Sequence, residues 1–446
     1  MSMENLVPKR ELNLVQTSAL IVGAVIGSGV FMNIPIIADI TGSPLLSILI
    51  WLGGGLLWIP QIMILAELGT AYPNQGGPYY FIYKAGSPFL AFQYTWTAFL
   101  TSDTPTLTII GLVAASALSY FFPALIDPVY SKIFAACLIL TFAFVQYRSV
   151  KTGGNLQVVL TISKLLPLFA IVGFGLFYLN SGNLSLGIGT EVKEERTLFT
   201  IINAGIAATL WAYAGFVNIL YMAGEVKNPH KSLPRALIGS IVFVIIAYIL
   251  ITLCTSAIVP FDKLVAAKGG IINPFEYLSI FSGAAGGVFA IVVFISMLGV
   301  LNAVIMAQPR LEYAMARDGL FFEVFGKLHP KYLTPHYSIF IQSGLAILLF
   351  TLGEIEDMLG YFTISYALQN GLIYGSIFFL RKKEEYKPSF KLKLWKFWGG
   401  LAILIQLYFS FGTFMAFPTG GIIASLGLIL LGTPVYLYYY KKKQSR

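Results

Sequence analysis

Long apolar segments alternate with short polar ones along almost the whole chain. Most of the segments reach the ~20 residues that an α-helix needs to cross the hydrocarbon core of a bilayer. Twelve are apparent, at residues 14–40, 44–70, 88–121, 131–147, 154–179, 199–225, 234–258, 284–308, 336–352, 358–380, 396–416 and 420–440. The pattern predicts an all-α membrane protein with 12 transmembrane helices.

The first apolar segment is interrupted near its middle by Gly27, Ser28 and Gly29. Glycine and serine are poor helix formers, so the backbone is expected to leave the helix there. In a bilayer, an unwound backbone is tolerated only where it faces protein or a water-filled cavity. The break therefore predicts a ligand site at mid-membrane depth. The alternative interpretation is a simple kink, or glycines that allow two helices to pack closely.

The sixth apolar segment is interrupted in a similar way, around Ala212, Ala214 and Gly215. Both interruptions lie in the first helix of a five-helix unit, and five is odd, so the two units run in opposite directions across the membrane. This is the inverted-repeat plan of secondary transporters. We therefore expect one repeat at 14–181, a second at 199–380 and two further helices at 396–440. Residues 1–13 and 441–446 are expected to be cytoplasmic tails.

Peptide groups at the two breaks are the predicted binding groups. A half-helix that begins exposes N–H groups, which suit a carboxylate, and one that ends exposes carbonyls, which suit an ammonium group. We expect N–H groups around Gly27 to Val30 to bind a carboxylate, and carbonyls near Val25, Trp211 and Ala214 to bind an ammonium. The predicted substrate-binding residues are Val25, Ile26, Gly27, Ser28, Gly29, Val30, Trp211, Ala212, Ala214 and Gly215.

Composition and charge narrow the class further. The 446 residues are 57% hydrophobic and 11% charged, which is too apolar for a soluble protein. Of the 29 Lys and Arg residues, 23 fall on segments that are cytoplasmic if the N-terminus is, so the net charge of +9 reflects topology rather than nucleic-acid binding. The chain has two cysteines, no phosphate-binding loop and no cluster of metal ligands. We expect no cofactor, no metal and no enzymatic activity.

Lys164 is the clearest single candidate for a functional residue. It lies inside the fifth segment, where a charge costs roughly 2.5–3.5 kcal/mol on insertion scales. It is expected to face the interior and donate to carbonyl or hydroxyl groups, and the alternative is that its chain extends to the interface. In the eighth segment, Ser296 stands alone where paired hydroxyls would suit a sodium ion.

Asp103 is a second intramembrane charge, in a stretch rich in Ser and Thr within the third segment. An acid at this depth is a functional hypothesis by default. Four roles are open for Asp103. It could pair with a cationic substrate, carry a proton, contact Lys164 indirectly, or be a protonated carboxyl in a polar helix interface.

Five motifs in order resemble the amino acid–polyamine–organocation superfamily, in particular its L-type amino acid transporter branch and bacterial relatives. They are Gly27 to Phe31, Glu67 to Gly69 with Tyr72 to Tyr79, Gly154 to Leu166, Leu210 to Pro234, and Asn302 with Arg310 and Ala314 to Gly319. The resemblance covers about residues 12–380 and implies the LeuT-type fold. It also implies that Lys164 replaces a sodium ion, that Trp211 covers the substrate, and that Tyr248 lies near the first break. In the animal carriers of this branch a Cys after the third helix tethers a heavy subunit. The loop at 122–131 has none, so no such partner is expected.

We therefore expect a sodium-independent transporter that moves zwitterionic amino acids by alternating access. We expect it to be an exchanger, because a fixed Lys charge disfavours reorientation of the empty carrier. The expected location is a prokaryotic plasma membrane with both termini in the cytoplasm. Three alternatives stay open: proton-coupled amino acid uptake, uptake of cationic amino acids or polyamines, each using Lys164 or Asp103, and a sensor that binds without transporting.

Overall fold

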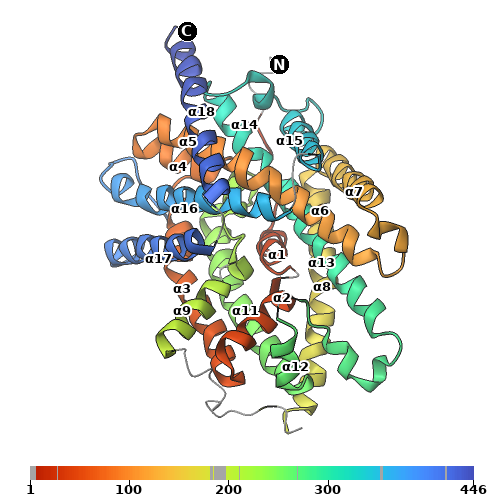
Figure 1. Ribbon diagram of the computed structural model, residues 1–446. Coiled ribbons are helices and arrows are strands. Elements are labelled where there is room, and N and C mark those ends of the chain that lie inside the picture. The colour runs from red at the N-terminus through yellow and green to blue at the C-terminus, as the bar shows by residue number, and fades with distance from the viewer. Residues whose placement is uncertain are drawn as a thin grey trace.

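The computed structural model describes residues 7–27, 29–180, 184, 197–209, 211–268, 270–351, 355–416 and 419–445. Side chains are described for all of these except residues 211, 355–365, 367, 368, 411–416 and 419–425. Within these ranges the regular structure is helical, apart from an isolated parallel bridge between Leu12 and Val226. The all-α class predicted from the sequence is confirmed (Figure 1).

A helix or a series of helices occupies each of the twelve predicted apolar segments. The first half of the chain contains α1 (Leu14–Val25), α2 (Gly29–Thr41), α3 (Pro44–Ala71), α4 (Gly77–Ala85), α5 (Pro88–Thr97), the π-helical η2 (Ala98–Asp103), α6 (Thr104–Leu118), η3 (Pro123–Ile126), α7 (Pro128–Arg148) and α8 (Val150–Phe177).

The second half opens with short elements around an interruption and continues with longer helices. It contains α9 (Leu198–Thr209), η4 (Trp211–Tyr213), α10 (Asn218–Tyr221), η5 (Ala223–Glu225), α11 (Pro229–Ile258), α12 (Phe261–Ala266), η6 (Pro274–Tyr277), η7 (Ser279–Phe281), α13 (Ala285–Ala307), α14 (Pro309–Arg317), η8 (Glu323–Gly326), α15 (His336–Leu349), α16 (Ile355–Leu380), α17 (Trp395–Ala416) and α18 (Thr419–Gln444).

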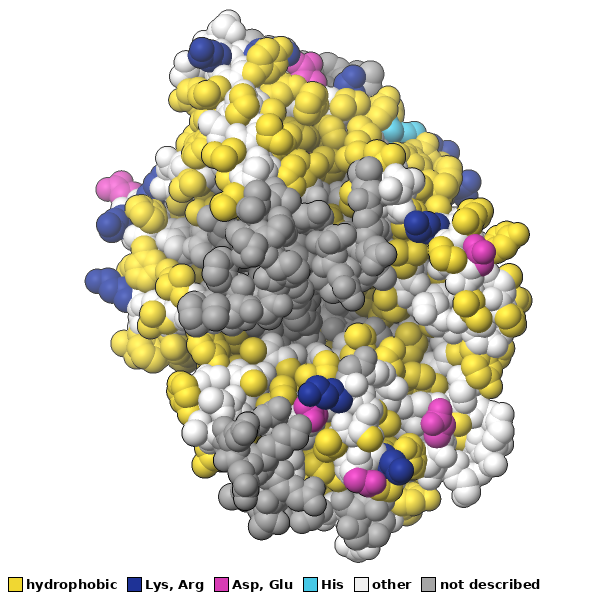
Figure 2. All heavy atoms as spheres, in the orientation of Figure 1, with side chains coloured by type: hydrophobic (Ala, Val, Ile, Leu, Met, Phe, Trp, Pro, Cys, Tyr) yellow, Lys and Arg dark blue, Asp and Glu magenta, His cyan; other side chains and the backbone are white. Residues whose placement is uncertain are grey.

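Six helices within the described residues are long and apolar enough to cross a membrane. The pair α1 and α2, bent by 45° at its break, makes a seventh span if it is counted as one. Two apolar helices are shorter than the sequence pattern predicts, α9 with 12 residues and α15 with 14. Apolar side chains also cover much of the surface (Figure 2), and on α8 Ile162, Leu166 and Phe169 are all exposed. A surface of this kind is suited to contact with lipid rather than water.

Two separate hydrophobic clusters form the interior. The smaller one joins α6, α7, α13 and α15 through side chains that include Leu107, Ile139, Leu301 and Ile339. The larger one joins α1, α2, α3 and α11 with parts of α16 and α17. Helix α8 contacts both, because Leu168 and Ile171 belong to the larger cluster while Leu156 and Leu160 pack against the smaller. Helix α13 also belongs to both, because Ala303 and Met306 are in the larger cluster and Leu301 and Ile305 in the smaller, so α8 and α13 join the two clusters.

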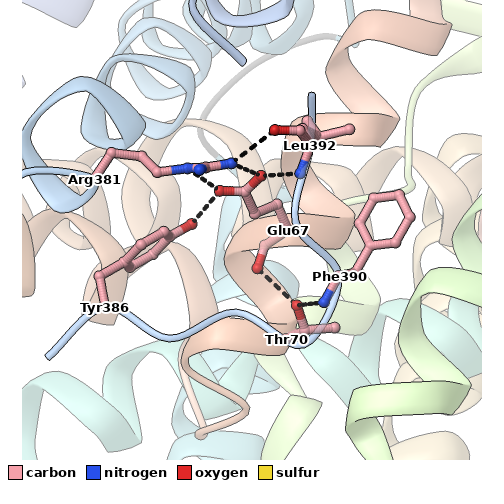
Figure 3. A network of polar contacts seen from close by, with 6 residues as sticks. All are labelled: Glu67, Thr70, Arg381, Tyr386, Phe390 and Leu392. Atoms are coloured by element: carbon pink, nitrogen blue, oxygen red, sulfur yellow. Dashed lines mark hydrogen bonds and ion pairs between the residues drawn. The ribbon is translucent and has the colours of Figure 1, made fainter. Parts of the chain in front are cut away.

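A buried ion pair ties the end of α3 to the segment between α16 and α17 (Figure 3). Glu67 on α3 is fully buried and accepts hydrogen bonds from Arg381 Nε and NH2, each at 2.6 Å. The hydroxyl of Tyr386 and the backbone N–H of Leu392 complete its shell at 3.0 and 2.8 Å. Burial and the carboxylate of Glu67 together raise the pKa of Tyr386. Because all four donors converge on one carboxylate, this segment is anchored rather than loosely attached.

We predict that Glu67→Gln lowers the free energy of unfolding by about 3–5 kcal/mol, because it leaves the Arg381 guanidinium buried without its counter-ion. The matched control is Glu323→Gln, which removes an acid from the exposed pair with Lys442 and should cost less than about 1 kcal/mol. Thermal unfolding of the two purified variants in the same detergent measures the difference. Equal melting temperatures would show that the Glu67 network adds no more than a surface pair.

Candidate functional site

Two helices are interrupted in the interior of the molecule. Helix α1 ends at Val25 and α2 begins at Gly29, which defines the first break. Helix α9 ends at Thr209 and α10 begins at Asn218, with the short η4 between them, which defines the second break. At each break, N–H groups and carbonyls lack the partners that a continuous helix supplies.

The two breaks lie directly against each other. Gly215 in the second break has φ of +120°, and a Cβ there would lie 3.3 Å from the backbone C and O of Ala24. On the other side, the Cβ position of Gly29 is 3.9 Å from Cα of Ala212. A side chain at Gly215 would therefore adopt an unfavourable conformation and also press on the end of α1. These contacts bring Val25, Gly29, Ala212 and Gly215 into one place.

Tyr248 on α11 connects the breaks. Its hydroxyl lies 2.8 Å from the carbonyl oxygen of Ala212 and 3.3 Å from that of Val25, and donates its single hydrogen between them. The ring packs edge-on against Trp51 and Tyr213, with centroids 4.9 and 5.1 Å away. Because a carbonyl has two lone pairs, each of these oxygens retains the capacity to accept a further hydrogen bond.

Lys164 on α8 supplies the ammonium at the first break. Its Nζ donates to the carbonyls of Gly23 at 2.6 Å and of Ile26 at 2.5 Å, the last turn of α1 and the residue after it. The side chain is 1% exposed, so it does not extend to the interface. On the far side, the Cβ position of Gly299 on α13 lies 3.3 Å from Nζ. The ammonium thus satisfies carbonyls that unwinding has released, and it sits beside α13.

Lys164 is the last of three polar side chains that α8 directs at α1. Thr161 donates to the carbonyl of Ala19 at 3.0 Å, and Gln157 lies 3.4 Å from the same oxygen. Gln157 also accepts from Asn302 of α13 at 2.7 Å. Our sequence analysis did not identify Thr161 as part of the site. The spacing of residues 157, 161 and 164, which places them on one face of a helix, was the available signal.

The remaining predicted residues fall at different places. Ile26 accepts from Lys164 as described, Gly27 faces Met297 of α13, and Val30 is fully buried in the first turn of α2. Ala214 lies in the second break and Ser296 is buried on α13. Ser28 and the side chain of Trp211 are outside the described residues, so the predicted carboxylate contact and gate at these positions stay predictions.

Asp103 lies apart from the breaks. Its Oδ1 accepts hydrogen bonds from Gln308 at 3.2 Å and Ser102 at 3.5 Å, and none of its described contacts is to Lys164. The sequence placed it near substrate depth, but a position along a span does not specify which side of the helix a residue occupies. The role of Asp103 is therefore considered separately from the breaks.

The end of the molecule that carries both termini is closed by buried polar contacts (Figure 1). Arg310 of α14 binds Glu225 after the second break, with Nε 3.0 Å from Oε1, and both side chains are buried. Gln75 donates to the same carboxylate at 2.9 Å. Nearby, Tyr79 donates to Asp318 at 2.9 Å, and burial raises the pKa of both groups. The chain before α1 adds backbone bonds, including Lys227 N–H to Leu12 at 2.7 Å.

A cavity of about 500 Å³ lies toward the opposite end, between α2, α9 and the loop after α12. Its lining is mostly aliphatic, and an ion pair between Lys268 and Asp39 at 2.9 Å lies at its edge. The described lining residues are Ile36, Asp39, Ile40, Thr200, Ile201, Ala204 and Lys268. The cavity adjoins α2 and α9, which are the helices next to the first and the second break.

The arrangement is suited to binding rather than to covalent chemistry. The first turn of a helix has N–H groups without intrahelical partners, which suit a carboxylate, and carbonyls such as those of Val25 and Ala212 suit a cation. Over the described part of the chain, no group of three or more His, Cys, Asp or Glu side chains is placed to hold a metal ion.

Comparison with known proteins places these features in a family. The family model described as amino acid permease matches residues 12–437. The serine/threonine exchanger SteT of Bacillus subtilis is 28% identical over 449 residues, which covers 98% of each chain. The mouse b(0,+)-type amino acid transporter 1 is 26% identical over 97% of this chain and 89% of its own, and human large neutral amino acids transporter small subunit 2 is 25% identical over 96% and 80%. The relatives are transporters and not enzymes, as predicted.

We predict that Gly215→Ala destabilises the protein by about 1–3 kcal/mol, because alanine disfavours the φ of +120° and its methyl would contact Ala24 at 3.3 Å. The control is Gly239→Ala on α11, where nothing lies within 4 Å of the Cβ position. There the helix should gain up to about 1 kcal/mol. Melting temperatures of both variants, measured without substrate, test the contact between the breaks. A Gly215→Ala protein as stable as Gly239→Ala would contradict it.

Proposed function

This chain belongs to the amino acid permease family, and from that premise we propose that it is a sodium-independent exchanger of zwitterionic amino acids. The membership itself makes the protein a multi-pass amino acid transporter. The single observation that carries the finer proposal is the pair of adjacent breaks with the Lys164 ammonium bound to the first of them. From this observation we infer the independence of sodium, the zwitterionic cargo and the transport mechanism.

The proposed independence of sodium rests on Lys164. Sodium-coupled carriers need a cation among oxygen ligands at the helix break, and here the ammonium already occupies the carbonyls of Gly23 and Ile26. A positive charge covalently attached to α8 cannot leave with the substrate. If that charge makes the empty carrier slow to reorient, the transporter exchanges one substrate for another rather than accumulating it. The Bacillus subtilis relative, which is named as a serine/threonine exchanger, supports this part of the proposal.

The proposed cargo is a zwitterion because both poles of the site are made of peptide groups. N–H groups of Gly29 and Val30 at the start of α2 suit a carboxylate. The Val25 and Ala212 carbonyls suit an ammonium, and the hydroxyl of Tyr248 holds the two carbonyls at a fixed separation. Among the described residues, the hydrogen-bond partners of Asp103 are Gln308 and Ser102, which lie outside the breaks, so this acid gives no support to a cargo with an additional positive charge.

The proposed mechanism is alternating access within a 12-helix LeuT-type fold of two inverted repeats, at 14–181 and 199–380. Support comes from the two interrupted helices that lie against each other, which is the feature expected at the interface of two inverted repeats. Lysine and arginine placement favours both termini in the cytoplasm, and the loop at 122–131 without a cysteine suits a prokaryotic plasma membrane protein. On that assignment, the Arg310–Glu225 pair closes the cytoplasmic side in this structure.

We predict that Lys164→Met lowers the rate of exchange at least tenfold. The substitution leaves the carbonyls of Gly23 and Ile26 buried without donors, which costs about 1–3 kcal/mol for each group, and 1.4 kcal/mol corresponds to a factor of ten. Lys151→Met, on an exposed position of the same helix, is the control. Uptake of labelled amino acid into proteoliposomes compares the two. Exchange by Lys164→Met at the rate of its control would remove Lys164 from the mechanism.

The proposed function predicts counterflow. Proteoliposomes loaded with an unlabelled neutral amino acid, such as serine or leucine, should take up the labelled one faster than empty vesicles. Replacing sodium by choline should leave the rate unchanged. Uptake into empty vesicles that is driven by a pH gradient would instead indicate proton coupling. Binding without counterflow would indicate a sensor.

A pair of variants at the first break ties this assay to the proposed site. Gly29→Ala should retain counterflow, because the Cβ position is 3.9 Å from its nearest neighbour, Cα of Ala212. Gly29→Val places two further methyl groups in the space assigned to the substrate carboxylate and should abolish counterflow. Both variants should elute as folded protein from a sizing column.

A further inference from the structure

A group of buried polar side chains lies outside the breaks and has no role in the mechanism above. Asp103 ends the π-helical segment η2, a type of distortion that is frequent at functional sites. Gln308 lies at the junction of α13 and α14, and Glu312 follows it by one helical turn on α14. The structure places Asp103 and Glu312 within electrostatic range of each other.

Most of the oxygen atoms in this group have no hydrogen-bond partner. Gln308 uses its amide nitrogen to bind Asp103 Oδ1 at 3.2 Å. The atoms left over are Oδ2 of Asp103, Oε1 of Gln308 and both carboxyl oxygens of Glu312, and all four are buried. An unpaired buried carboxylate is among the costliest groups to place in a protein interior. Two of them together indicate that something positive is bound.

The groups that face the pair do not supply that charge. They are the tyrosine hydroxyls of Tyr94 on α5 and Tyr221 on α10, both of which are neutral donors. Arg310, also on α14, donates hydrogen bonds from Nε and Nη2 to the carboxylate of Glu225. Among the described residues, therefore, no lysine, arginine or histidine forms an ion pair with Asp103 or Glu312.

We propose that Asp103 and Glu312 form a proton-binding site, in which the pair takes up one proton from water and Gln308 holds the carboxyl of Asp103 in place. Uptake converts one carboxylate to a carboxylic acid, and no other bond changes. Two close carboxylates that share a single proton avoid the repulsion between two negative charges. A metal cation would need a shell of several ligands, and the side chains of Asp103, Gln308 and Glu312 are too few to provide it. A proton needs no such shell.

The site is positioned to sense the state of the transporter, and this step rests on the proposed function. Tyr221 lies near both carboxyls and on α10, next to the second break, and its hydroxyl is 3.0 Å from that of Tyr94. When α10 moves to open the cytoplasmic side, the Tyr94–Tyr221 contact separates and water reaches the pair. Proton binding thus favours the closed state, and proton release favours the open one.

Infrared spectroscopy of the reconstituted full-length protein tests the site without requiring transport. We expect the wild type to show the C=O stretching band of a buried protonated carboxyl. Asp103→Asn and Glu312→Gln should each remove or shift that same band. Glu323→Gln, which alters an exposed acid, should leave it unchanged.

A wild-type spectrum without the band, or a band that responds to only one of the two variants, would overturn the shared site. Loss of the band on addition of sodium at constant pH would also overturn it, in favour of a metal cation. Counterflow is measured on the same vesicles, so the two proposals fail separately. Absent counterflow with the expected spectra would refute the exchanger and leave the proton site standing.

Discussion

An interrupted helix inside a bilayer protein is possible only if the peptide groups that it releases find other partners. In this chain, the carbonyls at the end of α1 are met by the Lys164 ammonium and the Tyr248 hydroxyl, and the latter also reaches the second break. One cation and one hydroxyl therefore hold two unwound segments in place.

The buried charges divide into three groups with different tasks. Glu67 with Arg381 and Glu225 with Arg310 are ion pairs that fasten segments distant in the sequence. Lys164 is a single charge satisfied by backbone dipoles, which makes it part of the break itself. Asp103 and Glu312 retain unpaired oxygens, and their neighbours are neutral. Two structural ion pairs, a fixed charge at the first break and a pair of acids thus occupy separate places in one interior.

Several parts of this arrangement were accessible from the sequence because they depend on local chemistry. Apolar length predicts helices, Gly-Ser-Gly predicts the first break, and an intramembrane lysine must be buried and satisfied. The partners of the buried charged residues could not be predicted from the sequence. Nothing local relates Glu67 to Arg381, which is 314 residues away, or Asp103 to Glu312, because such contacts are made only when the helices pack. Thr161 was not predicted as part of the site for another reason, because a threonine in an apolar segment ordinarily lies on the surface of its helix.

The sequence by itself determined the class of protein, the positions of the helices and the two places where they stop. These follow from hydropathy and backbone preference, which act over a few residues. Only the tertiary structure decided that the two breaks touch, that Lys164 reaches the end of α1, and that Asp103 faces α14 instead of the breaks. Each of those outcomes depends on the rotation of a helix about its own axis, and that rotation is set by packing against neighbours that the local sequence does not specify.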